Sequence, residues 1–271
     1  MTAPAAPAAP ATHALRDNLT WLRRNLLHAR RYPSLTLNLL LTPVILLLLF
    51  VYVFGDVMSA GITGGPGDRS EYIAYVVPGV LLMTVGGTAI GTAVSVASDM
   101  TEGIIARFRT MAISRASVLI GHVAGSVIQT LTALAVVLAV GLAIGFRPDA
   151  TPVEWLAAAG LLTLFSLALI WIAVGMGLVS PNAEGASNLA LPLMVLPLLS
   201  SAFVPVDAMP GWFSWFAEYQ PFSPATETLR GLLLGSAIGT KNALLTVGWC
   251  LALTVLGYFW SRSRFTREPR A

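Results

Sequence analysis

Residue types that could perform covalent catalysis are few in this chain and poorly spaced. Ser126 and His122 stand one helical turn apart in the same apolar stretch, and no G-x-S-x-G string is present. A serine hydrolase inside a membrane needs its nucleophile and its base on facing helices. His122 is therefore expected to bond locally. Cys250 is the only cysteine, so it forms neither an intramolecular disulfide nor a zinc site. The sequence predicts no catalytic residue and no metal site.

The chain also lacks the usual motif for nucleotide binding. A phosphate-binding loop reads G-x-x-x-x-G-K-[ST]. The nearest string here, Gly235 to Lys241, reads GSAIGTK and has the wrong spacing. We therefore expect no cofactor in this chain. If ATP and Mg²⁺ are used, a separate subunit binds them.

Six long stretches without charged residues account for most of the chain. Hydrophobic residues make up 56% of the sequence and charged residues 11%. About 20 apolar residues in a helix cross a hydrocarbon core, and these runs lack the alternation of barrel strands. The sequence predicts an all-α polytopic membrane protein with six transmembrane helices, at about 35–54, 74–98, 118–145, 155–179, 187–206 and 242–260. No charge lies in the middle of these runs, which argues against an ion-coupled carrier.

The basic residues are distributed unevenly between the predicted loops. Five arginines lie in the first 31 residues, three lie between 107 and 115, and four follow residue 261. The positive-inside rule then places both termini in the cytoplasm. The excess of arginine (15, against one lysine) is typical of a GC-rich bacterial genome, so the expected location is a bacterial plasma membrane. With no soluble domain to present this charge, nucleic-acid binding is not expected.

The two ends of the chain are expected to lie outside the membrane core. Residues 1–13 consist mainly of Ala, Pro and Thr and predict a disordered tail. Residues 14–31 repeat leucine at three- and four-residue spacing with arginines between. This pattern indicates an amphipathic interfacial helix, with a solvated linker as the alternative. Residues 263–271 are expected to form a cytoplasmic tail.

The segment 99–115 between the second and third spans predicts a short amphipathic helix. Asp99 or Thr101 can cap it, and Glu102 complements its positive end. An apolar stripe is flanked by two arginines; these residues are Ile104, Ile105, Phe108 and Met111, with Arg107 and Arg109. Such a helix can rest on the membrane or enter a groove of a partner protein. The periodicity leaves both possibilities open.

The segment 207–241 is rich in proline and aromatic residues. Two short apolar pieces, Trp212–Ala217 and Leu229–Leu234, are too short to span a membrane. They predict re-entrant or interfacial helices on the outer face, with Trp212 and Trp215 near the headgroups. A plain aromatic anchor loop is the alternative. Glu218 interrupts the segment, and Glu227 and Arg230 are three residues apart, so they can pair on one helix.

Small residues and prolines modify the predicted spans. Gly86, Gly87 and Gly91 predict a small-residue face on the second span, suited to close helix contact. Prolines within spans can kink the helices that contain them; they are Pro78, Pro192 and Pro197. Glu184 falls in a short turn, SPNAEGASN, that is expected on the cytoplasmic side.

Three strings resemble permease subunits of ABC type-2 transporters, in particular the daunorubicin-resistance exporter branch of actinobacteria. They are DMTEGIIARFRTMAISRASVLIGH, YVVPGVLLMTVGGTAIGTAVSVASDM and LPLLSSAFVPVDAMPGWFSWFAEYQPFSPATETLRGLLLG. The likeness covers about residues 15–260. The chain departs from the family at Ala106, where an acidic residue is common, and at Ala112, where proline is common.

The resemblance implies an ABC type-2 transmembrane domain over 14–262 that works as a homodimer or heterodimer with a separate ATPase. The 99–115 helix would then be the ATPase-coupling helix, through Glu102, Ile105, Arg107, Phe108, Arg109 and Met111. The outer re-entrant pair would include Trp212, Trp215, Glu218, Glu227 and Arg230. The expected function is ATP-driven export of a hydrophobic or amphipathic small molecule such as a drug, an antibiotic or a lipid-like compound. An ATP-independent secondary carrier and export of a lipid-linked glycan are the alternatives.

Overall fold

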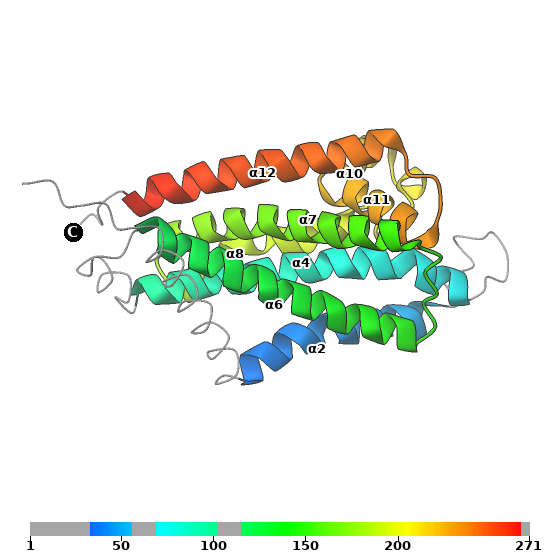
Figure 1. Cartoon of the computed structure of the whole chain (residues 1–271), viewed down its shortest axis with the longest axis horizontal. Coiled ribbons are helices and arrows are strands. Elements are labelled where there is room, and N and C mark those ends of the chain that lie inside the picture. Colours follow the sequence, from blue (N-terminus) through cyan, green and yellow to red (C-terminus); the bar gives the residue numbers. More distant parts are fainter. Residues whose placement is uncertain (1–32, 56–68, 102–114, 267–271) are drawn as a thin grey trace, which may run out of the picture.

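The computed structural model describes residues 33–55, 69–101 and 115–266, and helices dominate these ranges. No strand occurs among the described residues, which confirms the all-helical prediction for them. The long helices run side by side along one axis (Figure 1). In chain order the elements are α2 (Pro33–Leu49), the π-helix η1 (Phe50–Phe54), α4 (Arg69–Thr101), α6 (Arg115–Ala143), α7 (Pro152–Val179), α8 (Ala183–Ala190), α9 (Pro192–Val195), the 3₁₀ turns η2 (Leu196–Leu199) and η3 (Val206–Ala208), α10 (Gly211–Tyr219), α11 (Phe222–Leu234) and α12 (Thr240–Thr266).

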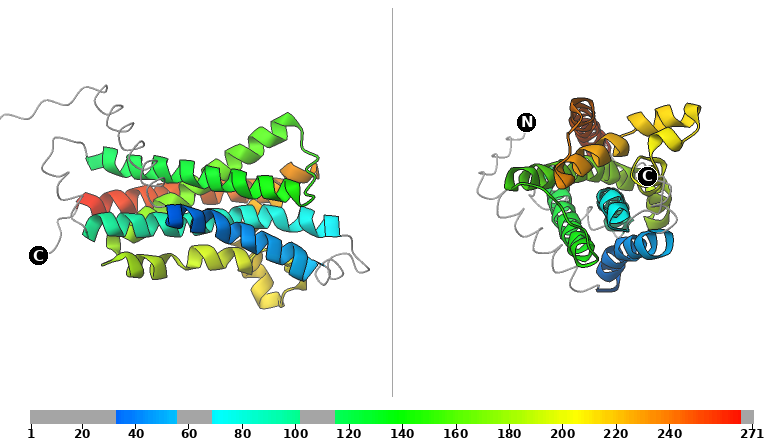
Figure 2. Two further views of the ribbon diagram at one scale, coloured as in Figure 1. Left: turned by 90° about the horizontal axis from the view of Figure 1, so that it is seen from below. Right: turned by 90° about the vertical axis from the view of Figure 1, so that its right-hand side faces the viewer.

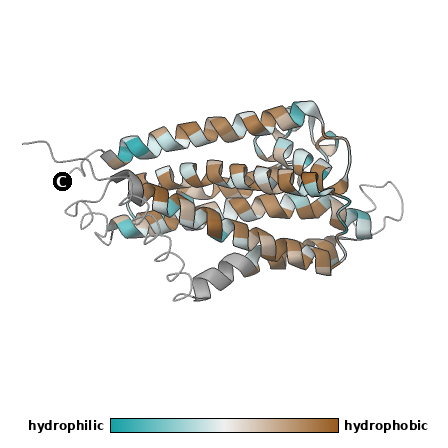
Figure 3. Cartoon of the chain, in the orientation of Figure 1, coloured by the Kyte–Doolittle hydropathy of each residue, from teal (hydrophilic) through white to brown (hydrophobic). Residues whose placement is uncertain are grey.

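Four helices are long and apolar enough to cross a membrane. They are α4, α6 from Leu119, α7 and α12 to Phe265. Figure 3 shows their hydrophobic middles and the hydrophilic residues near their ends. The segments Leu41–Phe54 and Ala183–Leu199 are shorter apolar helices. The chain is therefore a multi-pass membrane protein, and the first and fifth spans of the six-span prediction stay predictions.

Helix α4 is the centre of the bundle. Of the residues in its most apolar stretch 78% are buried, whereas the corresponding value is 28% for α6 and 17% for α12. Seen along the bundle axis, α4 is surrounded by the other helices (Figure 2). Because α6 and α12 are apolar but exposed, their outer faces suit contact with lipid or with another protein.

Glycines allow close approach along one stripe of α4. A Cβ added at Gly86 would lie 2.2 Å from the carbonyl oxygen of Leu193, and one at Gly79 would lie 2.7 Å from Ala202. The prediction of a small-residue contact face is thus confirmed for Gly86. It is wrong for Gly87, where an added Cβ meets nothing within 4 Å, and Gly91 is exposed. Neighbouring helical residues point about 100° apart, so the contact stripe follows the seven-residue spacing of Gly79 and Gly86.

The predicted span 187–206 is not one continuous helix. The helix begins earlier, at Ala183, where Asn182 Oδ1 accepts a 2.7 Å hydrogen bond from the N–H of Gly185. Pro192 and Pro197 have no N–H to donate, and the helix gives way to 3₁₀ geometry and ends at Leu199. Glu184 consequently lies in the first turn of α8 and not in a connecting turn.

Serine side chains replace some of the backbone bonds lost at this break. Ser200 Oγ donates to the carbonyl of Pro197 and accepts a 3.1 Å bond from the N–H of Ala202. Residues 200–205 form irregular turns that connect η2 to η3. Irregular backbone inside a membrane is tolerated only where protein or water forms hydrogen bonds with its N–H and C=O groups. The backbone groups at this break therefore need such partners.

Candidate functional site around the helix break

Helix α11 fills the end of the bundle beside this break. It packs against α4, α7 and α12, and Phe222 meets Phe165 of α7 edge-on with ring centres 5.1 Å apart. Its last turn is closed by Gly235, whose φ of 63° is the left-handed conformation that glycine favours. The N–H of Asp149 donates to the carbonyl of Leu233 at 3.0 Å. This contact ties the loop after α6 to the end of α11.

The structure corrects the predicted extent of this piece. Leu229–Leu234 was expected to form a short re-entrant or interfacial helix, but the helix is longer: α11 starts at Phe222, and most of its residues are buried. Its polar residues are accommodated because their hydroxyls bond to the preceding turn: Thr226 to the carbonyl of Phe222 and Thr228 to that of Pro224, each at 2.7 Å. These bonds within the helix satisfy the two hydroxyl groups without any partner from outside it.

Helix α10 matches the other predicted piece more closely. It covers Gly211–Tyr219 and includes the expected Trp212–Ala217. It stands out from the bundle in the end-on view of Figure 2, with Trp212 82% and Trp215 68% exposed. The structure therefore has a helix here and not a plain loop, while its depth in a membrane stays a prediction.

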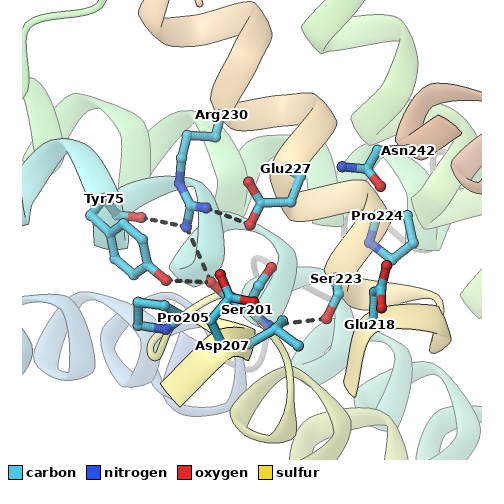
Figure 4. Close-up of a pocket in the computed structure, with 11 residues that line it drawn as sticks. Tyr75, Ser201, Pro205, Asp207, Glu218, Ser223, Pro224, Glu227, Arg230 and Asn242 are labelled. Atoms are coloured by element: carbon cyan, nitrogen blue, oxygen red, sulfur yellow. Dashed lines mark hydrogen bonds and ion pairs between the residues drawn. The ribbon is translucent and has the colours of Figure 1, made fainter. Parts of the chain in front are cut away.

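Arg230 joins three segments that are far apart in the sequence (Figure 4). Its guanidinium bonds Glu227 at 2.7 Å, which confirms the predicted pairing on one helix. It also donates to the carbonyl of Tyr75 at 3.1 Å and to that of Ser201 at 3.2 Å, and it lies 3.9 Å from the centre of the Tyr75 ring. The Arg230 side chain is 13% exposed and that of Glu227 is 37% exposed, so the guanidinium is largely shielded from water while its counter-charge is partly solvated.

Tyr75 and Ser201 were not expected at this site. The hydroxyl of Tyr75 donates to the carbonyl of Ser201 at 2.9 Å, and the N–H of Ser201 donates to Ser223 Oγ at 3.0 Å. The carbonyl freed by the break thus receives two donors, one from α4 and one from α11. In the sequence, Ser201 within a proline-interrupted apolar run was the available signal.

A pocket of about 420 Å³ lies against this network. Acidic residues outnumber basic ones on its wall: Asp207, Glu218 and Glu227 against Arg230. The full lining is Tyr75, Ser201, Pro205, Val206, Asp207, Glu218, Ser223, Pro224, Glu227, Arg230 and Asn242. Of the predicted outer-segment residues, Glu218, Glu227 and Arg230 therefore meet at one pocket, while Trp212 and Trp215 are not in its lining.

A second set of contacts links α10 to α12 beside the pocket. Lys241 donates to Glu218 at 2.7 Å and to the hydroxyl of Tyr219 at 3.1 Å, and the indole N–H of Trp249 donates to the carbonyl of Tyr219 at 2.9 Å. Next to them is an open surface depression of about 580 Å³ with an almost wholly apolar wall, which we call the α12 groove. Its lining is Tyr219, Lys241, Leu244, Leu245, Gly248, Trp249 and Ala252.

At the opposite end of the bundle, α4 and α6 meet through a buried contact. Nε2 of His122 lies 3.1 Å from Oδ2 of Asp99, without the geometry of a directed hydrogen bond. The loop between these helices lies outside the described residues. The predicted coupling residues Glu102, Ile105, Arg107, Phe108, Arg109 and Met111 fall in it, and the amino-terminal tail and interfacial helix are outside the described ranges too. The coupling role of these residues and the two amino-terminal elements stay predictions.

The chain matches known proteins over most of its length. The family model for the ABC-2 type transporter matches residues 17–234. The daunorubicin resistance ABC transporter permease protein DrrB1 of Streptomyces coeruleorubidus is 30% identical over 83% of this chain and 77% of that protein. The probable doxorubicin resistance ABC transporter permease protein DrrC of Mycobacterium tuberculosis is 25% identical over 66% of this chain and 68% of that protein.

A third relative is longer than this chain. ABC transporter G family member 20 of Dictyostelium discoideum is 27% identical over 70% of this chain but only 26% of its own length. The region matched by the family model, residues 17–234, includes both α4 and the helix break beside the pocket. On the strength of the family match and of the 30% identity to a drug-resistance permease, the chain belongs to the ABC-2 type transporter family.

Proposed function

We propose that this chain is the membrane permease subunit of an ATP-driven exporter that moves a hydrophobic or amphipathic small molecule out of the cell. The single observation that carries the proposal is the match over most of the chain to permeases named for daunorubicin and doxorubicin resistance. The apolar bundle supports it, because four of its helices are long enough to cross a membrane. The polar pocket beside the helix break offers a place where such a compound could be held.

ATP hydrolysis belongs, in this proposal, to a separate ATPase subunit. The absence of a phosphate-binding loop from the sequence supports this division. The amphipathic segment 99–115 would dock in the ATPase and carry its motion to the spans. The contact between Asp99 and His122 supports such a role, since it joins the two helices that flank the segment. A dimer of permeases would work with two ATPase copies, shifting between inward- and outward-facing states.

The proposed location is a bacterial plasma membrane with both termini in the cytoplasm. The end of α12 carries Arg262 and Arg264, and it lies at the opposite end of the bundle from α10 and α11 (Figure 1). With basic residues inside, the acidic pocket would face the outer side. A compound leaving the cell would then pass this pocket late in its path.

The proposal can be tested at Phe108, on the apolar stripe of the predicted coupling helix. Large buried aromatic residues dominate small interfaces, so Phe108→Ala should weaken ATPase docking by about 2 kcal/mol, or roughly thirtyfold. Co-purification of the ATPase with permease at equal expression measures this effect, and Thr110→Ala, off the stripe, is the control. Export and the stimulation of ATP hydrolysis by transported compound should fall together in the Phe108 variant.

Two results would count against the proposal. ATPase association that is equal in the two variants would mean that the stripe rests on lipid and does not enter the ATPase. Export that continues without any ATPase and stops when the ion gradients are dissipated would identify a secondary carrier instead.

A further inference from the structure

We propose that α6 is a movable arm on a fixed frame of α4, α7, α9 and α12, and that the contact between Asp99 and His122 is the joint about which the arm turns. The role of this movement in transport rests on the proposed export function. The movement itself is a property of this chain and can be measured without an ATPase. It follows from how closely the frame helices approach one another and from how differently α6 is held.

The frame helices meet through their backbones at glycine positions. A Cβ added at Gly177 of α7 would lie 2.5 Å from the carbonyl oxygen of Ala93 in α4, and one at Gly257 of α12 would lie 2.8 Å from the backbone of α7. Gly86 brings α4 similarly close to the backbone of α9 at Leu193. At such contacts no side chain lies between the helices to change its torsion angles and let them slide. The four helices therefore keep one relative position.

Helix α6 is held to this frame by side chains. At Gly141 the nearest atoms to an added Cβ are the methyl groups of Val77 in α4, at 3.6 Å, which is ordinary van der Waals contact. Leu134 and Val137 of α6 are buried in the main core of the bundle. Side chains can follow a small sliding movement of a packed helix by changing their torsion angles. These contacts therefore hold α6 without fixing its position as the glycine contacts do.

The hydrogen bond between α4 and α6 in the middle of the bundle can break without leaving a hydroxyl unbonded. Thr130 Oγ1 lies 2.9 Å from Thr88 Oγ1 and 2.8 Å from the carbonyl oxygen of Ser126, one turn earlier in α6. Its single proton can go to either acceptor, and Thr88 donates its own proton to the carbonyl of Val85. Because an unbonded buried group is the main cost of losing such a bond, this contact is releasable.

The contact between Asp99 and His122 holds α6 more firmly. The side chains are 17% and 5% exposed, so water screens their 3.1 Å contact little. Their neighbours along both helices belong to a second apolar cluster, separate from the main core, that joins α4, α6, α7 and α12; its buried members are Val96, Leu119, Val123, Ile170, Trp171, Val174 and Phe265. Separation here would bury the imidazole without this carboxylate, which is costly. Movement of α6 is therefore smallest at this joint and grows toward the other end of the bundle.

The movement can be measured as distances between pairs of spin labels, by electron paramagnetic resonance on the full-length chain in lipid nanodiscs. Label cysteines replace exposed residues in a Cys250→Ala chain, with Val255 of α12 as the common partner. Ala139 of α6 and Leu156 of α7 lie near the same end of the bundle and form the arm pair and the frame pair with Val255. The distance distribution of the arm pair should be about twice as broad as that of the frame pair. Ala124 of α6, near the joint, should give a narrow distribution with Val255.

Substitutions separate the joint from the releasable contact. Asp99→Asn keeps the shape of the side chain but removes its charge, and the contact lacks a directed hydrogen bond that an amide could preserve. It should broaden the distribution of the Ala124 pair, whereas Asp207→Asn, the same change at an exposed position near the other end, should not. Thr130→Val should broaden the arm pair further and leave the thermal midpoint nearly unchanged. Thr132→Val removes an exposed hydroxyl that bonds within α6 and should change neither.

Arm and frame distributions of equal width would overturn the inference, as would an Ala124 distribution that Asp99→Asn leaves unchanged. A thermal midpoint that falls markedly in Thr130→Val but not in Thr132→Val would show that the contact with Thr88 is not releasable. Any of these results in a chain that still recruits an ATPase and exports would leave the proposed function standing. A broad arm distribution in a chain that recruits no ATPase would uphold the movable arm and refute that function.

Discussion

Two adjacent glycines of α4 provide a sharp test of the packing. At Gly86 an added Cβ would lie 2.2 Å from the carbonyl oxygen of Leu193, more than 1 Å inside ordinary van der Waals contact. That oxygen is backbone, so it cannot turn aside as the end of a flexible side chain would. At Gly87, one residue along the same helix, an added Cβ meets nothing within 4 Å.

We expect Gly86→Ala and Gly87→Ala to change stability in opposite directions. Alanine in a helix is favoured over glycine by about 0.5–1 kcal/mol, and at Gly87 nothing opposes this gain. At Gly86 the two segments must separate, and overpacking costs about 1–3 kcal/mol. The difference between the variants corresponds to a shift on the order of 5–10 °C in the midpoint for a chain of this size.

The measurement is the apparent thermal midpoint of each purified variant in detergent, at one protein concentration and one scan rate, since membrane proteins often unfold irreversibly. The retention time on size exclusion checks that each variant is folded before heating. Equal midpoints for the two variants would refute the close approach of α4 to the α9 segment. A lower midpoint for Gly87→Ala alone would place the contact stripe on the wrong side of the helix.

Two further results are expected. Arg230→Lys keeps the charge but not the planar fork of donors, so it should lower the thermal midpoint, because carbonyls of two other segments lose their donor. The control is Lys241→Met, which breaks an exposed ion pair and should leave the midpoint nearly unchanged. Equal effects of the two substitutions would contradict the joining role of Arg230. Single cysteines placed in a chain without its native cysteine should be labelled by an impermeant reagent on intact cells at Asp68 but not at Thr266, and labelling at Thr266 would contradict cytoplasmic termini.

The sequence predicted the helical class well because length and hydropathy are local properties. The helices α4, α6, α7 and α12 follow directly from long uncharged runs. The bounds around the fifth run were less predictable. Hydropathy continues smoothly through 187–206, but Pro192 and Pro197 remove backbone donors and Ser200 offers its hydroxyl in their place. A hydropathy pattern does not register these hydrogen bonds.

In the site, too, local contacts could be predicted from the sequence and contacts between distant segments could not. The pairing of Glu227 with Arg230 followed from their spacing of three on one helix. The partners Tyr75 and Ser201 lie 155 and 29 residues from Arg230 in the chain, and no spacing rule connects them. The same limit applies to Gly86 and Gly87, which are alike in sequence and differ only in what faces them.

The helix break and the pocket have a common physical origin. Ending a helix inside an apolar bundle leaves carbonyls that need donors, and at Ser201 the chain provides them from Tyr75 and Arg230. A buried arginine in turn needs a counter-charge, which Glu227 supplies. These requirements explain why Arg230 and Glu227 lie together on α11 in an otherwise apolar bundle.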